Sequence, residues 1–187
     1  MIKFVSMALA VVLTLSMLAG CGSNKTPETT APQQTTAAPA VSVEGTMEEL
    51  LNKVIAENPV EFMGGVMPID LTDTSEDGLW ALKNFTGLDS AESITEAAAY
   101  EPMMGSLAFS MVMVRVAEGS DAKVVAENMK AGIDTRKWIC VEANDVMAAG
   151  YGDVVMFIML DSNNGMTAQS FVDAFAKVVG AELDFVI

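Results

Sequence analysis

The chain has 187 residues, of which 51% are hydrophobic, and its ten basic and 25 acidic residues give a formal net charge of −15. This acidity makes nucleic acid and anionic lipid headgroups poor partners. The sequence contains no histidine, which removes the commonest general base, the commonest zinc ligand and every Ser–His or Cys–His catalytic pair.

The first twenty residues have the layout of a secretory signal peptide. Lys3 supplies the positive charge, residues 4–18 are mostly apolar, and small residues follow. The run is shorter than the roughly 20 apolar residues of a membrane-spanning helix. It ends in Leu18-Ala19-Gly20-Cys21, which resembles the lipobox of bacterial lipoproteins. The resemblance implies cleavage between Gly20 and Cys21 and a diacylglycerol thioether on Cys21, so we expect a cell-membrane protein anchored by lipid on the extracytoplasmic face.

Residues 21–43 are expected to be the lipidated cysteine followed by a disordered tether. The segment is rich in Ser, Thr, Gln and Ala, has three prolines (Pro27, Pro32 and Pro39) and lacks aromatic residues, so it cannot bury enough apolar surface to offset its ordering entropy. Residues 44–187 then have the length of one domain with its own core. The expected organisation is therefore a signal peptide at 1–20, a tether at 21–43 and a domain at 44–187.

The domain is predicted to begin with a helix after Thr46, the first residue of a capping-box pattern with Glu49. Asn58-Pro59 ends that helix. The acidic, turn-like segment from Asp70 to Gly78 precedes a second, weaker helix. Between the two helices, at most a short extended stretch is expected.

The remainder predicts strands and two further helices. Ile94–Tyr100 and Leu107–Val116 predict strands, and the second is apolar on both faces, as inside a sheet. Arg115 ends that strand, where an ion pair with a carboxylate is expected. Ser120 is the expected N-cap of the next helix. The buried stripe of that helix is expected to consist of Val124, Val125 and Met129. The last expected elements are strands at Trp138–Val141, Val146–Ala149 and Val154–Leu160 and a helix from Thr167 to Gly180.

This order of elements, with tight connections in the second half, predicts an α+β fold. We expect a two-layer sandwich with a largely antiparallel sheet of about four to five strands and with the helices on one face.

Several segments of the domain resemble a group of uncharacterised bacterial lipoproteins. They are Tyr100–Gly105, Ala126–Lys130, Arg136–Val141 and Gly152–Met156. That group combines a lipobox, a Thr/Pro-rich tether and one small α+β domain of unknown function. The resemblance therefore implies architecture and location, and no activity.

Four acidic residues are the weak candidates for a metal site: Asp70, Asp73, Glu76 and Asp77. Calcium prefers oxygen-rich loops, but the spacing differs from that of a known calcium loop, and acidic residues also favour helix N-termini. Capping and solvation are the favoured interpretation. No cofactor is expected.

Sulfur side chains offer two further candidates. Soft thioethers suit copper(I), and Met103-Met104 is the one pair in a loop, whereas the strand methionines are expected to fill the core. Cys140 has no intramolecular partner once Cys21 carries lipid, and its apolar neighbours predict a buried thiol rather than a nucleophile.

The sequence thus favours a membrane-anchored, non-enzymatic binding or interaction domain whose protein or small-molecule partner is unknown. An enzyme that uses carboxylates or calcium, and a structural component of the cell envelope, remain alternatives. If the signal peptide is removed with Lys3, nine basic and 25 acidic residues leave a net charge of −16, which permits cationic ligands or peptides.

Overall fold

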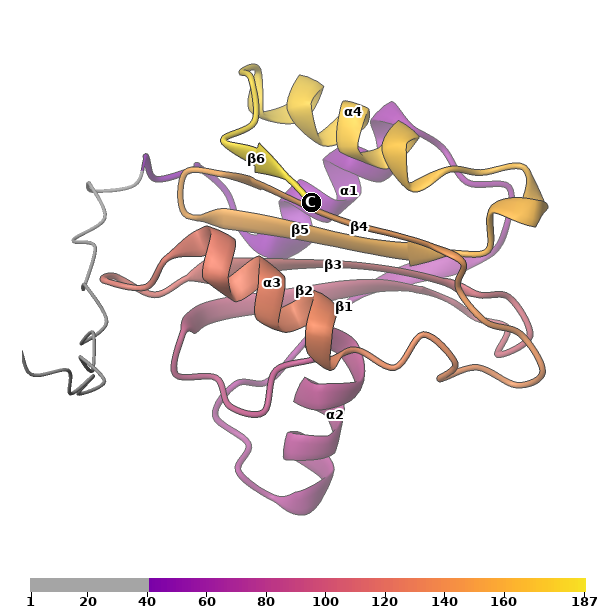
Figure 1. Ribbon diagram of the computed structural model, residues 1–187, viewed down its shortest axis with the longest axis horizontal. Helices are drawn as coiled ribbons and strands as arrows, with labels where there is room; N and C mark the ends of the chain where they lie inside the picture. Colours follow the sequence, from indigo (N-terminus) through magenta and orange to yellow (C-terminus); the bar gives the residue numbers. More distant parts are fainter. Residues whose placement is uncertain (1–40) are drawn as a thin grey trace, which may run out of the picture. The chain divides into compact units, whose positions relative to one another are not determined.

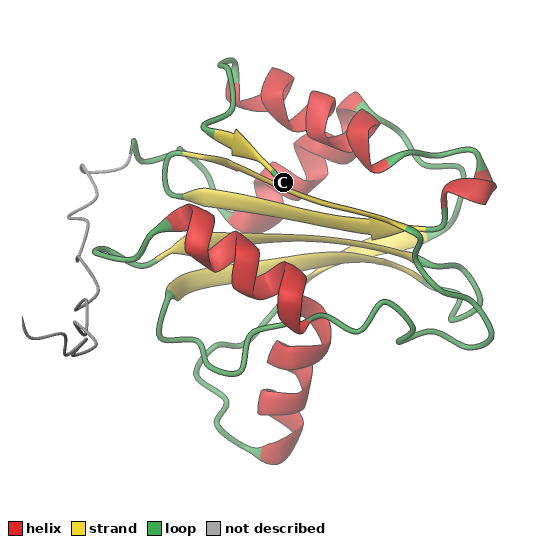
Figure 2. Cartoon of the chain, viewed as in Figure 1, coloured by secondary structure: helices red, strands yellow, loops and turns green. Residues whose placement is uncertain are grey.

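The computed structural model describes residues 41–187. The expected signal peptide, the Gly20–Cys21 cleavage site and most of the tether lie outside the described residues. The helices are α1 (Met47–Glu57), α2 (Glu76–Thr86), α3 (Ala122–Gly132) and α4 (Ala168–Val179), with a short 3₁₀ helix η1 (Ser162–Asn164). The strands are β1 (Gly64–Pro68), β2 (Ile94–Pro102), β3 (Phe109–Val116), β4 (Asp145–Tyr151), β5 (Val154–Leu160) and β6 (Phe185–Val186) (Figures 1 and 2).

The strands form one antiparallel sheet in the order β1-β2-β3-β5-β4-β6. The α+β class and the antiparallel sheet are confirmed, and the strand count is slightly higher than expected. The two edge strands account for the difference. β1 is only five residues long, and β6 pairs with β4 through two residues near the end of the chain. Such short segments give little periodic signal.

Helices cover both faces of the sheet, so the expectation of helices on one face is wrong. On one face, α1 and α4 share a core with Phe109, Met111 and Met113 of β3. On the other face, α2 and α3 pack with Val112 and Val114 of the same strand. Every residue of β5 is buried as well. A sheet whose central strands are apolar on both sides must be covered on both sides.

Local capping signals explain most helix boundaries. Thr46 and Glu49 form the predicted capping box of α1, and Thr167 caps α4. The predicted N-cap Ser120 of α3 is wrong by one residue, because the Asp121 carboxylate accepts hydrogen bonds from the backbone N–H groups of Lys123 and Val124. An aspartate caps a helix at least as well as a serine does.

The buried stripe of α3 differs from the prediction for a related reason. It consists of Val125, Ala126 and Met129. Val124, expected to be buried, is half exposed to solvent. The stripe is still spaced by three and four residues, as an amphipathic helix requires.

The described chain enters the domain beside the turn between β4 and β5. Val41 O accepts a hydrogen bond from Asp153 N at 2.9 Å, and Val43 N donates to the Asp153 carboxylate at 2.8 Å. The Arg115 guanidinium pairs with Asp153 at 2.7 Å and donates to Val43 O and Gly45 O. The ion pair expected for Arg115 is confirmed, and it fastens the beginning of the domain to the sheet.

Among residues 41–187, every buried core residue lies between Met47 and Phe175. Within these residues, no helix has the length and apolar character needed to cross a membrane.

Candidate functional site

A pocket of about 240 Å³ opens on the α2/α3 side of the sheet, near the turn that joins β2 to β3. Its lining combines aromatic rings, thioethers and one buried ion pair. The lining residues are Met67, Asn84, Phe85, Glu101, Pro102, Met104, Gly105, Lys137 and Trp138. They come from β1, α2, β2, the β2–β3 turn and the loop between α3 and β4.

Two of the lining residues, Lys137 and Glu101, form a polar cluster with the buried Ser110. Lys137 Nζ lies 2.8 Å from Glu101 Oε1 and 3.1 Å from Ser110 Oγ, and it also donates to the carbonyl of Asn84. Ser110 Oγ in turn donates to the same Glu101 oxygen. The side chains of Lys137 and Glu101 are only 6% and 12% exposed. A charged pair held this far from water, with every lysine donor used, is a rigid feature of the site.

Aromatic rings enclose the ammonium group. Lys137 Nζ lies 5.0 Å from the ring centroid of Phe85 and 5.3 Å from that of Trp138, within range of cation–π attraction. Burial lowers the pKa of Lys137, while the neighbouring Glu101 carboxylate opposes this shift. The ion pair and the rings therefore compensate part of the cost of burying the charge.

The contact between Ser110 and Lys137 does not form a nucleophile–base pair. The Ser110 side chain is fully buried on the central strand β3, and its hydroxyl donates to Glu101 rather than to the lysine. Serine nucleophiles need an accessible oxygen and a base that can accept their proton. The cluster instead fixes the positions of Glu101 and Lys137 in the pocket.

Exposed methionines border the pocket. Met103 is 75% exposed, and Met63, Met67 and Met104 are exposed as well. The strand methionines that were expected in the core, Met111, Met113, Met156 and Met159, are fully buried. Met63 lies beside Met103, since Met103 N donates to Met63 O at 2.9 Å. The sequence analysis singled out Met103 and Met104, and in the structure this pair belongs to a larger group of exposed methionines that includes Met63 and Met67.

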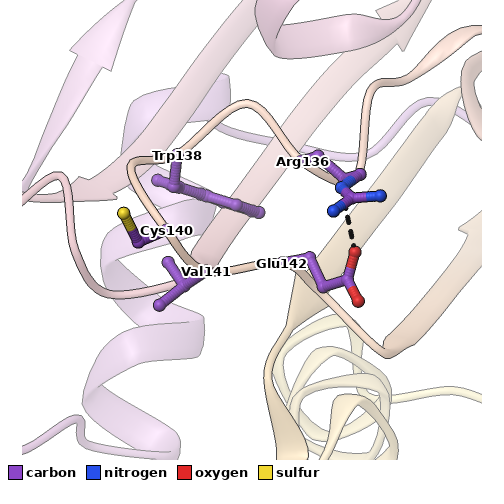
Figure 3. Close-up of a pocket in the computed structure, with 5 residues that line it drawn as sticks. All are labelled: Arg136, Trp138, Cys140, Val141 and Glu142. Atoms are coloured by element: carbon purple, nitrogen blue, oxygen red, sulfur yellow. Dashed lines mark ion pairs between the residues drawn. The ribbon is translucent and has the colours of Figure 1, made fainter.

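A second hollow of about 320 Å³ lies next to the first and shares Trp138 with it. Figure 3 shows its lining, with Arg136 and Glu142 joined by an exposed ion pair of 3.1 Å and the Cys140 sulfur pointing away from that pair. The predicted strand at Trp138–Val141 is wrong, because these residues belong to a loop. Ile139 N bonds to Gly105 O in the β2–β3 turn instead of joining a ladder.

The buried thiol expected at Cys140 is also wrong. Cys140 is exposed, and its backbone φ of 63° is the left-handed conformation that side chains with a Cβ rarely adopt. Because of this turn, side chains in the segment do not alternate between two faces as they do in a strand, and Cys140 stays exposed although its neighbours are apolar.

The four acidic candidates do not converge on one point. Asp70 accepts hydrogen bonds from the backbone and hydroxyl of Thr72, and Asp73 accepts one from Ser75 N, so each closes its own turn. These bonds lower the pKa of both Asp70 and Asp73. Glu76 and Asp77 occupy the first turn of α2. Within residues 41–187, no group of three His, Cys, Asp or Glu side chains is arranged to hold a metal ion.

The β2–β3 turn, which contributes to the pocket lining, and the described beginning of the chain lie at opposite ends of the sheet (Figure 1). Ser110 of the polar cluster pairs with Met159, whereas Arg115, which holds the entering chain, pairs with Val154. Five residues of strand separate Ser110 from Arg115, a distance of about 17 Å at the usual rise. Whatever the entering segment is attached to, the pocket faces the other end of the domain.

The chain matches no known protein family, and neither characterised proteins nor solved structures show significant similarity to it. The resemblance to uncharacterised lipoproteins therefore stays a prediction that depends on the sequence segments alone.

Proposed function

We propose that this chain is a lipid-anchored, extracytoplasmic binding protein without catalytic activity, and that the pocket above the Lys137–Glu101 pair is its binding site. The observation that carries the proposal is the position of this pocket. It opens at the end of the sheet opposite Val41, where the described chain begins. In a protein held to a membrane through its N-terminal segment, such a site would lie at the end of the domain farther from the point of attachment.

The chemistry of the pocket supports binding. Flexible, polarizable methionines adapt to different apolar surfaces, and proteins use them at binding surfaces for this reason. Trp138 and Phe85 add rigid apolar area beside the methionines. The Lys137–Glu101 pair fixes a polar group among these apolar ones, and a few fixed polar groups in an apolar pocket are what orients a ligand.

Metabolic labelling with a clickable fatty acid tests the anchor. We expect the wild-type chain to carry the label and to fractionate with membranes, and Cys21→Ser to abolish both the label and the cleavage between Gly20 and Cys21. Cys140→Ser is the matched control, because it removes the only other cysteine and should leave labelling unchanged. A Cys21→Ser protein that still carries the label, or a processed Cys21→Ser protein that fractionates with membranes without the label, would overturn the anchor.

The reactivity of Cys140 tests whether the pocket is accessible in the membrane-anchored protein, because the exposed Cys140 thiol lies in the same loop as Trp138 of the pocket. In membranes that contain the anchored protein, a membrane-impermeant maleimide should label Cys140 readily. Protection of Cys140 in the absence of any ligand would show that the bilayer or another protein covers this end of the domain.

A further inference from the structure

The outer edge of β1 is a free edge of the sheet. Met63 O accepts from Met103 N and Ile69 N donates to Ala97 O, so the odd-numbered residues of this strand direct their backbone groups toward β2. The backbone groups of Gly64 and Val66 therefore point outward, and within residues 41–187 they form no backbone hydrogen bond on that side. Pro68 faces the same way and has no N–H to offer, which limits pairing on this edge to a short segment.

Gly65 leaves an opening between this edge and the pocket. It pairs with Glu101, and because side chains alternate along a strand, Met63, Gly65, Met67 and Glu101 share one face of the sheet. A Cβ atom at Gly65 would meet nothing within 4 Å. A gap one side chain wide thus separates Met63 from Met67 and leads from the strand edge to the Glu101 carboxylate.

One oxygen of the Glu101 carboxylate has no hydrogen-bond donor among the described residues. Lys137 and Ser110 both bond to Oε1, and no described residue donates to Oε2. Since no buried side-chain oxygen among residues 41–187 lacks a partner, Oε2 must reach solvent. Lys137 compensates the charge of the carboxylate, so Oε2 offers a fixed hydrogen-bond acceptor among apolar groups, which suits an ammonium or guanidinium donor on an apolar stem.

We propose that an extended basic peptide segment binds by adding a strand to the outer edge of β1, with one lysine or arginine side chain lying over Gly65 and reaching Glu101. This inference rests on the proposed function and names the class of partner. An added strand lies about 4.8 Å beyond β1 and about 10 Å from β2, a gap that a long basic side chain and the Glu101 side chain can close together. Gly64 and Val66 supply the backbone hydrogen bonds, as in other strand-addition complexes.

The size of the pocket and the charge of the protein favour this partner. About 240 Å³ is below the roughly 300–1,000 Å³ of typical small-molecule sites, so the pocket fits one side chain of a larger ligand. The net charge of −15 favours the approach of a cationic segment.

Fluorescence of Trp138 provides the binding assay. The chain has two tryptophans, and Trp80→Phe leaves Trp138 in the pocket as the only one. The assay uses the chain from residue 22 to 187, which contains all the buried core residues of the described part. The probe is an acetylated and amidated peptide of sequence TVKVKVT. TVEVEVT is the matched probe of opposite charge. We expect the lysine peptide to change the Trp138 emission saturably and the glutamate peptide to have no effect.

Two variants separate the parts of the proposal. Glu101→Gln should lower the affinity for the lysine peptide about tenfold, the usual loss for a charge-assisted hydrogen bond. The control Glu127→Gln removes an exposed carboxylate on α3 and should leave this affinity unchanged. Gly65→Val should abolish binding by filling the gap. Since the added side chain has open space and valine favours strands, the melting temperature of Gly65→Val should not fall, which keeps the test valid if Glu101→Gln proves unstable.

Backbone methylation of the probe tests strand addition. In antiparallel pairing, the peptide valines lie opposite Gly64 and Val66 and supply the bonded amides, so N-methylation of the valines should abolish binding and N-methylation of the lysines should not. Equal affinity of the two charged probes, or undiminished binding by Gly65→Val or by the valine-methylated peptide, would overturn the inference. The proposed function would survive this result if Cys21 is lipidated and Cys140 is accessible on membranes.

Discussion

Replacing both partners of the Lys137–Glu101 pair together should destabilise the domain less than the two single replacements added together. Lys137→Met leaves a Glu101 carboxylate that is 88% buried without its counter-charge. Breaking a buried pair in this way costs about 3–5 kcal/mol, and we expect the lower end, about 3 kcal/mol, because one oxygen of Glu101 reaches solvent and Ser110 still donates to the other.

Glu101→Gln should cost less, about 2 kcal/mol, because the amide oxygen can still accept from both Lys137 and Ser110. In the double variant no charge is left uncompensated, so we expect a loss of only about 2 kcal/mol, chiefly from missing hydrogen bonds. The two substitutions would then couple by about 3 kcal/mol.

Urea unfolding at pH 7, followed by far-ultraviolet circular dichroism, measures these free energies of unfolding. The neighbouring exposed pair of Arg136 and Glu142 provides the matched control, since its substitutions to Met and Gln should each change stability by less than about 1 kcal/mol. Additive effects of Lys137→Met and Glu101→Gln, within about 0.5 kcal/mol, would refute the conclusion that these charges form a buried, coupled pair.

Further predictions concern other parts of the domain. Arg115→Met should cost about 1–3 kcal/mol and should raise amide hydrogen exchange in residues 41–47, and unchanged exchange there would contradict the role of Arg115 in holding the entering chain. Met156→Ala, in the core, should cost about 2–5 kcal/mol, whereas Met103→Ala should change the free energy of unfolding by less than about 0.5 kcal/mol. The pKa of Asp70, measured by carbon NMR, should lie below the ordinary 3.8 because Asp70 accepts hydrogen bonds from Thr72. These bonds stabilise the turn fully above pH 3.8 and are lost as the pH falls through the lowered pKa. A measured pKa at or above 3.8 would contradict this prediction. Burial lowers the pKa of Lys137 in the folded state below its ordinary 10.5, so between these two pKa values the unfolded chain binds more protons than the folded one. The free energy of unfolding of wild type, relative to that of Lys137→Met, should therefore rise as the pH climbs toward 10.5. A difference that stays constant or falls would contradict this prediction.

The elements that the sequence predicts correctly are those with strong local signals. The capping box at Thr46 and the continuous apolar runs of β3 and β5 depend on neighbours in the chain, which the sequence shows directly. The same apolar runs already implied a sheet covered on both faces. The expectation of helices on one face failed because the order of the elements does not show to which face each helix returns.

The loop around Cys140 was mispredicted because tertiary contacts outweigh its local pattern. Trp138–Val141 has the apolar, branched composition of a strand, but Ile139 pairs with Gly105 and Cys140 turns the backbone into the left-handed region. Neither the hydrogen bond nor the backbone conformation can be recognised from the sequence of the segment.

The pocket could not be found from the sequence because its polar cluster joins residues 101, 110 and 137, which come from two strands and a loop. Two weak signals existed. Ser110 is the one hydroxyl in a strand that is otherwise apolar up to Arg115, and Lys137 directly precedes an apolar run. A buried polar group requires a partner, but the sequence does not show which residue supplies it.

The rate at which a membrane-impermeant maleimide modifies Cys140 tests the central claim most directly. The measurement compares the lipid-anchored protein in native membranes with the unlipidated chain of residues 22–187. If the domain presents the pocket away from the bilayer, both forms should react at the same rate, since nothing new covers the loop next to Trp138. A much slower reaction of the anchored protein, restored when the membranes are dissolved in detergent, would place this end of the domain against the bilayer and contradict the account.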